Sequence, residues 1–243
     1  MKKKGYYALC FFIVTLIIIN INSRGSKYLM KGGELQTPIY YVNGEHKGKK
    51  IIIIGGIHGN EVGGVKGAEE MRNINLKRGQ LIIIPKANIE ACNLVVRNPY
   101  YMMDLNRVFP GKKQGTDPEK LAYEIFKLIE REKPHMVIDL HEWERDFEED
   151  SRLHVNGIIL NSMDKVFEMV SEITNHVGNS LNSNNRITYY SSSPEGSINK
   201  EVSDRLEIPV ITIESNMKNN LEERVELHKN IIKFILKTYE MSD

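Results

Sequence analysis

Two histidines and two glutamates stand at the ends of apolar runs in this sequence, and residues of these types bind transition-metal ions. His58 and Glu61 form an H-x-x-E pair after the apolar run 51–54, while His141 and Glu214 each follow a further apolar run. Two histidines and one carboxylate, with a fourth position left for water, are the ligand set of a catalytic zinc. Zinc lowers the pKa of its bound water to about 7 and so generates a nucleophile at neutral pH. The residue types therefore point to metal-assisted hydrolysis.

The loop that carries His58 is rich in glycine and has two further interpretations. A glycine-rich loop between a strand and a helix can bind phosphate, but neither G-x-G-x-x-G nor G-x-x-x-x-G-K-[ST] occurs here. The H-x-x-E pair can also be an ordinary pair of surface residues, because matches this short recur by accident. Three separate apolar runs nevertheless deliver His or Glu at their carboxyl ends, which favours one shared site.

The elements that position these residues follow from the alternation of short apolar runs with helical patterns after residue 30. The runs are mostly continuous, as in strands buried on both faces, and their alternation with helices favours a largely parallel α/β sheet. We expect Asp117 to cap the first of the clear helices, with Pro118 at its first position. The predicted strands are 51–54, 81–84, 136–140, 158–160, 187–190 and 210–213, and the helical apolar stripes lie within 121–129, 166–177 and 221–239.

Two carboxylates near the metal ligands have predicted roles of their own. Glu214 suits a general base outside the metal shell. Asp139 lies two residues before His141, on the same side of the strand. It either orients that histidine or accepts a hydrogen bond from a nearby loop backbone.

The segment 97–111 supplies residues that suit a substrate carboxylate. Arg107, beside Asn106, offers a planar fork of five donors, and Arg97 is a second candidate. Arg107 is flanked by the apolar residues Leu105 and Phe109. We therefore expect its guanidinium to be partly buried and to need a partner.

Four ordered motifs resemble the zinc carboxypeptidase superfamily, in particular its succinylglutamate desuccinylase/aspartoacylase branch. They are HGNE at 58–61, DLNRVFPG at 104–111, DLH at 139–141 and TIE at 212–214, and the resemblance covers about residues 50–216. It implies a three-layer α/β/α sandwich around a mixed, largely parallel sheet, with one zinc ion per chain. The implied zinc ligands are His58, Glu61 and His141. The implied substrate and catalytic residues are Asn106 and Arg107 for the terminal carboxylate, Arg97 for the scissile carbonyl and Glu214 for activation of the water.

Details of the sequence favour different activities within that superfamily. YYSSSPEGSIN at 189–199 resembles the tyrosine loop of the peptidases and makes Tyr190 a candidate substrate contact, an aromatic pair at a strand end being the alternative. HGNE and DLNRVFPG are most similar to the deacylases. One helix follows Glu214, so we expect no additional C-terminal β domain and a cleft open enough for a peptide. The candidate functions are a metallocarboxypeptidase and an N-acyl amino acid deacylase. A membrane-tethered binding protein that keeps the fold without turnover is the alternative from another class.

Composition and the N-terminal segment indicate where the protein works. Lys+Arg number 33 and Asp+Glu 32, so the net charge of +1 excludes a nucleic-acid binder driven by bulk charge. Three lysines precede the apolar segment 6–21, as in a secretory signal peptide or an N-terminal membrane anchor. We expect residues 1–26 to be that signal or tether, and 27–243 to form one exported catalytic domain. Its expected substrate is a small peptide or N-acyl amino acid with a free carboxylate.

Overall fold

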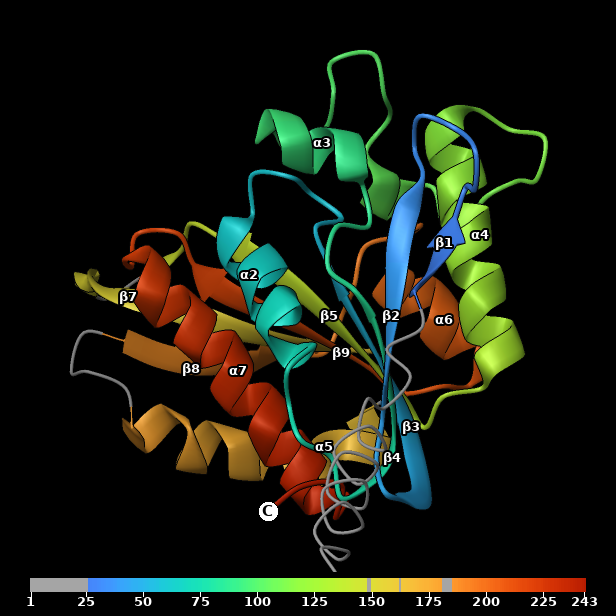
Figure 1. Ribbon diagram of the computed structural model, residues 1–243. Helices are drawn as coiled ribbons and strands as arrows, with labels where there is room; N and C mark the ends of the chain where they lie inside the picture. Colours follow the sequence, from blue (N-terminus) through green and yellow to red (C-terminus); the bar gives the residue numbers. More distant parts are fainter. Residues whose placement is uncertain (1–25, 148–149, 162, 181–184) are drawn as a thin grey trace, which may run out of the picture.

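A mixed β-sheet with helices on both faces forms the structure, a computed structural model that describes residues 26–147, 150–161, 163–180 and 185–243. The predicted three-layer α/β/α sandwich is confirmed (Figure 1). The expected signal or anchor segment, 6–21, lies outside the described residues. Within the described ranges, no helix is both long and apolar enough to cross a membrane.

Strands of the described chain pair in the order β1-β2-β4-β3-β5-β9-β7-β6, and β8 pairs with β7. The central strands β4, β3, β5 and β9 run parallel to one another, and β8 runs parallel to β7. The remaining pairings are antiparallel and lie toward the two edges of the sheet. The strands are β1 (Ser26–Leu29), β2 (Thr37–Asn43), β3 (His46–Gly55), β4 (Arg78–Ile84), β5 (Met136–Trp143), β6 (Asp146–Phe147), β7 (Asp150–Leu160), β8 (Asn185–Tyr190) and β9 (Val210–Asn216).

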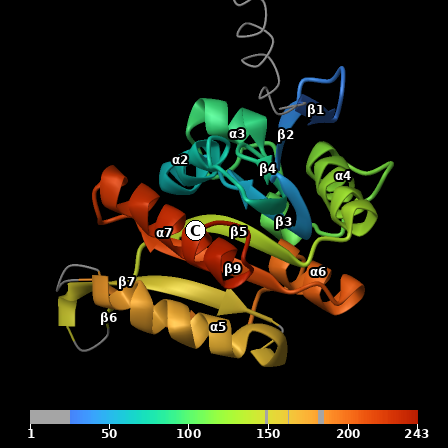
Figure 2. The same ribbon diagram turned by 60° about the horizontal axis from the view of Figure 1, so that its bottom comes forward.

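Helices cover the two faces of the sheet in separate layers, as Figures 1 and 2 show. On one face α2 (Val62–Met71), α5 (Met163–His176) and α7 (Leu221–Thr238) pack over one apolar core, and on the other α4 (Asp117–Glu132) and α6 (Ile198–Leu206) pack over a second. The continuous apolar runs supply both cores, because successive side chains of a strand point to opposite faces. In β3, Ile51 and Ile53 belong to the first core, and Ile52 and Ile54 to the second.

The carboxyl ends of the central strands differ from the prediction in length. The run 136–140 was expected to end before His141, but β5 continues through Trp143 because β9 continues beside it. In this register His141 pairs with Glu214, one residue from each of two parallel neighbours. Residues at the same level of adjacent strands point to the same side of a sheet. The extension of β5 therefore aligns a predicted ligand with the predicted base.

The start of α4 corrects one prediction. Asp117 is not its cap: Thr116 holds that position in an extended conformation, and Asp117 is the first helical residue. The Glu119 carboxylate reaches back to accept the Thr116 amide at 2.9 Å, which completes a capping box. Proline at 118 is therefore the second helical residue and still loses no intrahelical hydrogen bond. Strands β1, β2 and β6 and helices α3 (Ile89–Leu94) and α6 were not predicted.

Candidate metal centre

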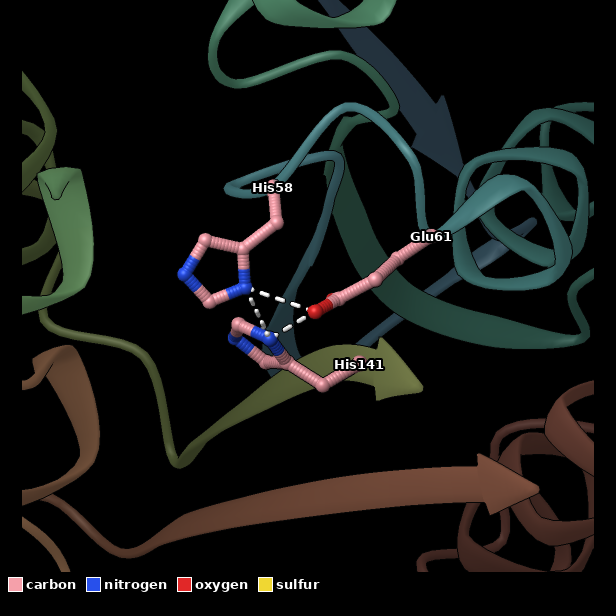
Figure 3. Close-up of side chains that lie close together, drawn as sticks. All are labelled: His58, Glu61 and His141. Carbon is pink, nitrogen blue, oxygen red and sulfur yellow. Dashed lines mark hydrogen bonds and ion pairs between the residues drawn. The ribbon is translucent and has the colours of Figure 1, made fainter. Parts of the chain in front are cut away.

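The three predicted metal ligands meet at the carboxyl end of the sheet (Figure 3). His58 lies in the loop between β3 and α2, Glu61 is the N-cap of α2, and His141 lies in β5. Since β3 and β5 are parallel neighbours, with Gly55 paired to Leu140, the loop after β3 turns directly beside His141. All three side chains are buried, with at most 3% of each residue exposed.

The donor atoms of this triad converge on a single point. His58 Nδ1 lies 2.7 Å from Glu61 Oε1, and His141 Nδ1 lies 2.8 Å from Glu61 Oε2. The two Nδ1 atoms are 3.2 Å apart. One ligand atom from each residue falls within 4.8 Å of the others, which is close enough for one ion to bind all three.

The outer ring nitrogens of both histidines contact carboxylates. His58 Nε2 lies 3.0 Å from Asp104 Oδ1, and His141 Nε2 lies 2.9 Å from Asp139 Oδ2. Of the two interpretations of Asp139, the structure supports the one in which it orients His141. If each Nε2 donates its proton outward, the two Nδ1 lone pairs face each other and the Glu61 carboxylate. Such an arrangement of acceptors is repulsive unless a cation lies between them, so the donor set fits a metal ion such as zinc.

The electrostatics of the triad also favour positive charge. Burial raises the pKa of Glu61, but the facing histidines, His141 above all, outweigh it and lower that pKa to about 2. Burial lowers the pKa of His141, yet the carboxylates of Asp139 and Glu61 raise it well above its usual value. Both shifts have one cause, the close contact of carboxylates with imidazole rings, in which each group stabilises the charged form of the other. A bound cation would stabilise the Glu61 carboxylate in the same way.

Glu214 lies beside the triad, but its pKa is raised whereas that of Glu61 is lowered. Burial raises the pKa of its carboxyl group, the charge of His141 lowers it, and Glu61 and Asp139 raise it again, to about 8. The three triad residues and Glu214 all line one cavity. A carboxyl group whose pKa lies near neutrality can take up and return a proton, which is what a general base requires.

A cavity of about 150 Å³ opens at the triad. Its walls come from the loop after β3, the segment 97–107, the ends of β5, β7 and β9, and the start of α6. The lining residues are His58, Glu61, Arg97, Asn106, Arg107, His141, Glu142, Trp143, Ile159, Ser193, Pro194, Ser197, Asn199, Thr212 and Glu214. Apart from Tyr190 and Asp139, every predicted site residue lies in this set.

Arg97 is tied to the metal triad rather than free in the cavity. Its Nη2 donates to Asp104 Oδ2 at 2.9 Å, and its Nη1 lies 3.7 Å from Glu61 Oε1. Its side chain is 48% exposed, so it faces solvent on its other side. Arg97 therefore links the carboxylate behind His58 to the mouth of the cavity.

Asn106 and Arg107 occupy a short 3₁₀ turn, Leu105–Arg107, and both line the cavity. Asn106 Nδ2 lies 3.4 Å from His141 Nε2, and its Oδ1 accepts the amide of Ile198 at 2.9 Å. Arg107 was expected to be partly buried, but it is exposed and donates from Nη1 to the Asn106 carbonyl at 2.7 Å. That expectation is wrong because successive residues of the turn point in different directions. Leu105 enters the core and Arg107 faces the cavity.

Tyr190 lies behind the cavity wall, at the end of β8. Its ring packs edge-on against Trp143, with the centroids 5.4 Å apart, and the Arg145 guanidinium lies over both rings. Trp143 lines the cavity, whereas Tyr190 does not. A substrate contact by Tyr190 therefore remains a prediction.

Sequence reasoning missed the roles of two carboxylates. Asp104, behind His58, was quoted only as part of the DLNRVFPG motif. Glu142, which is 4% exposed and follows a predicted ligand, was considered only as a general base in reserve after Glu214. Burial raises the pKa of Glu142, while Ser215, the Gly63 amide and Arg224 lower it. The signal that could have identified Glu142 is its position in an otherwise buried strand.

Solved structures of low sequence identity share this fold. An aspartoacylase family protein from Mesorhizobium loti superposes with a TM-score of 0.69 at 21% identity, covering 90% of this chain and 67% of its own. A succinylglutamate desuccinylase from Silicibacter gives 0.65 at 19% identity, covering 85% of this chain and 61% of its own. Tripeptide-bound Csd4, a cell shape determinant from Helicobacter pylori, superposes with a TM-score of 0.68 at 15% identity, covering 84% of this chain and 55% of its own. The chain thus spans between about half and two thirds of the length of these proteins.

Sequence comparison adds the family. A search of curated proteins found no match. Residues 47–154 match the model of the succinylglutamate desuccinylase/aspartoacylase catalytic domain. This range contains the three triad residues together with Arg97, Asp104 and Arg107. The resemblance to the succinylglutamate desuccinylase/aspartoacylase branch is thus confirmed over residues 47–154, which contain three of the four motifs, and the solved structures extend the likeness in fold to most of the chain.

Proposed function

We propose that this protein is a zinc-dependent hydrolase that cleaves an amide bond in a substrate with a free carboxylate. The observation that carries the proposal is the buried convergence of His58, Glu61 and His141, with Glu214 beside them on the wall of one cavity. The ligand types suit zinc, and a separate buried carboxyl group suits proton transfer. A binding protein without turnover has no need for that second carboxyl group, so the enzyme is favoured.

Five residues form the metal centre in this proposal. His58, Glu61 and His141 hold the zinc ion, and Asp104 and Asp139 keep the histidine rings turned toward it. Zinc bound there supplies a water of lowered pKa and polarises the scissile carbonyl.

The remaining residues move protons and bind substrate. Glu214 takes a proton during attack on the carbonyl and returns it to the leaving amine. Arg107 faces the cavity with its guanidinium fork and binds the substrate carboxylate, while Asn106 orients the turn that carries it. Arg97, at the cavity mouth, contacts the carbonyl side of the scissile bond. Tyr190, at the end of β8 and packed against the cavity-lining Trp143, acts as a further substrate contact.

The substrate class is a C-terminally free peptide or an N-acyl amino acid. Both are supported, since the matched catalytic domain is named for deacylases and Csd4 is described as a D,L-carboxypeptidase whose structure was solved with a tripeptide. We further propose that the apolar segment 6–21 directs export or tethers the protein to the outer side of a membrane. Peptides outside the cell would then be within reach of the cavity.

The test combines metal analysis with activity measurements on the full chain. We expect the parent protein to hold about one zinc ion per chain and to hydrolyse members of a panel of N-acyl amino acids and C-terminally free peptides. Replacing His58 or His141 by Ala should abolish stoichiometric zinc and activity together. His46→Ala, which removes an exposed histidine from β3, is the matched control and should keep both. Unchanged zinc in both ligand variants would contradict the site.

A further inference from the structure

The metal ligand Glu61 occupies a position whose side chain usually has another task. It is the N-cap of α2, where a side-chain oxygen ordinarily accepts the amide of the second or third helical residue. The Glu61 carboxylate instead faces the two histidines and makes no capping hydrogen bond to its own helix in the described chain. The first-turn amides of α2 therefore need an acceptor from elsewhere.

Glu142 supplies that acceptor from the neighbouring strand. Its Oε2 accepts the amide of Gly63, the second residue of α2, at 3.0 Å. The same oxygen accepts Arg224 Nη1 at 2.7 Å, and Oε1 accepts the Ser215 hydroxyl at 2.7 Å. The Glu142 side chain is 0% exposed, so these three donors replace water around it. A carboxylate at a helix N-terminus is also favoured by the helix dipole.

The fit between α2 and this carboxylate leaves no spare space. A Cβ atom on Gly63 would lie 2.1 Å from Glu142 Oε1 and 2.9 Å from the Cβ of Arg224. Glycine at this position lets the helix start approach the strand closely enough for the amide to reach the carboxylate. Ser215 follows Glu214 in β9, so the same carboxylate also contacts the strand that carries the predicted base.

We propose that Glu142, held by Arg224 and Ser215, is a positioning residue that caps α2 in place of Glu61 and so leaves Glu61 free to bind the metal. The inference rests on the proposed function in one respect, namely that the triad binds zinc. The chemistry favours a carboxylate here, because the Gly63 amide and the Arg224 guanidinium can only donate, and Arg224 is also positively charged. A glutamine of the same size would lose the negative charge that pairs with Arg224 and would turn an NH₂ group toward the Ser215 hydroxyl, which would then have to accept instead of donate.

The test measures zinc affinity, which reports on the ligand geometry without reference to turnover. Metal-free full-chain protein is titrated with zinc in competition with a chromophoric chelator, and its unfolding curve is recorded without metal. For Glu142→Gln we expect the zinc dissociation constant to rise at least about 10-fold, as is typical when a residue that orients a ligand is lost. The control Glu132→Gln removes a carboxylate that pairs with Lys50 near the amino end of β3 and should leave zinc affinity unchanged.

Gly63→Ala gives a second, independent variant, because its Cβ displaces the Glu142 carboxylate while alanine suits a helix better than glycine. It should weaken zinc binding as Glu142→Gln does, and it decides the question if the glutamine variant fails to fold. A folded Glu142→Gln protein with the zinc affinity of the parent would overturn the inference. So would a variant in which only KM changes, since Glu142 would then contact substrate. A parent that binds no zinc would instead contradict the proposed function.

Discussion

His228 is a buried histidine whose protonation should make the stability of this fold depend on pH. It lies in α7 and is 0% exposed. A Cβ atom added to Gly67 of α2 would lie only 2.9 Å from the Cβ of His228, so the two helices pack closely here. Neither of its ring nitrogens has a hydrogen-bond partner among the described residues. Burial lowers the pKa of His228 to about 3, against a smaller rise caused by Glu61. The folded protein therefore keeps this ring neutral.

The size of the effect follows from the two states. In the unfolded chain His228 takes up a proton near the usual pKa of about 6.5. Between about pH 6.5 and pH 3 the unfolded state thus binds more protons than the folded state, and the free energy of unfolding decreases as the pH falls. At pH 5, about 1.5 units below the pKa in the unfolded chain, the free energy of unfolding is about 2 kcal/mol lower than at pH values where both states are neutral. Above pH 7.5 both states are neutral and the loss vanishes.

Urea unfolding of the metal-free protein at pH 7.5 and pH 5.0 measures this loss. His228→Leu removes the titrating group and its two unpartnered nitrogens. The free energy of unfolding of the variant minus that of the parent should therefore be about 2 kcal/mol larger at pH 5.0 than at pH 7.5. Taking the difference between variant and parent cancels all other titrating groups. Ile232→Leu, a change of equal volume in the same helix, is the control and should differ from the parent equally at both pH values.

A constant difference between His228→Leu and the parent across this pH range would refute the reasoning. It would mean that the folded protein accommodates the imidazolium, either by opening α7 locally or by admitting water to the ring. Hydrogen exchange of the α7 amides at pH 5.0 would then distinguish local opening from hydration.

Three further predictions concern the cavity. Glu214→Gln should keep zinc and substrate affinity while kcat falls by about 10² to 10⁴-fold, because the amide cannot accept a proton; loss of zinc as well would make Glu214 a ligand. Arg107→Lys should weaken substrates with a free carboxylate far more than the matching amides, as their KM values would show, since a point charge cannot reproduce the bidentate fork; equal losses would indicate a structural role. Asp104→Asn should raise the zinc dissociation constant about 10 to 100-fold in chelator competition, because His58 loses the charged partner that orients it. An unchanged dissociation constant would mean that Asp104 has no role in zinc binding.

The convergence of the ligands could be predicted from the sequence because it depends only on strand topology. Apolar runs that are buried on both faces identify parallel central strands, and parallel neighbours bring their carboxyl ends to one edge. His58, His141 and Glu214 each end or follow such a run, so their proximity did not require any side-chain detail. Asp139 was placed correctly for the same reason, since residues two apart in a strand share a face.

What the sequence could not predict depends on short turns and on contacts between distant segments. Arg107 has apolar neighbours in the chain, but a tight turn separates them in space, so its exposure could not be read from them. Asp104 meets His58 across 46 residues, and Glu142 meets Arg224 across 82. Contacts of that kind have no periodic signal. They depend on how α7 and the segment around Asp104 pack against the sheet and its loops.

The glycines of α2 make the weak H-x-x-E pattern more informative when sequences are searched. A Cβ on Gly64 would lie 2.8 Å from the Leu140 carbonyl oxygen, and one on Gly67 would meet His228. The helix that begins at the predicted ligand Glu61 can therefore pack against β5 and α7 only with small residues at these positions. A search pattern that extends H-x-x-E by glycine two, three and six residues after the glutamate would reject most accidental matches. Conversely, a sequence that keeps the histidine and glutamate but carries large residues there is expected to have lost the close packing that brings Glu61 to His141.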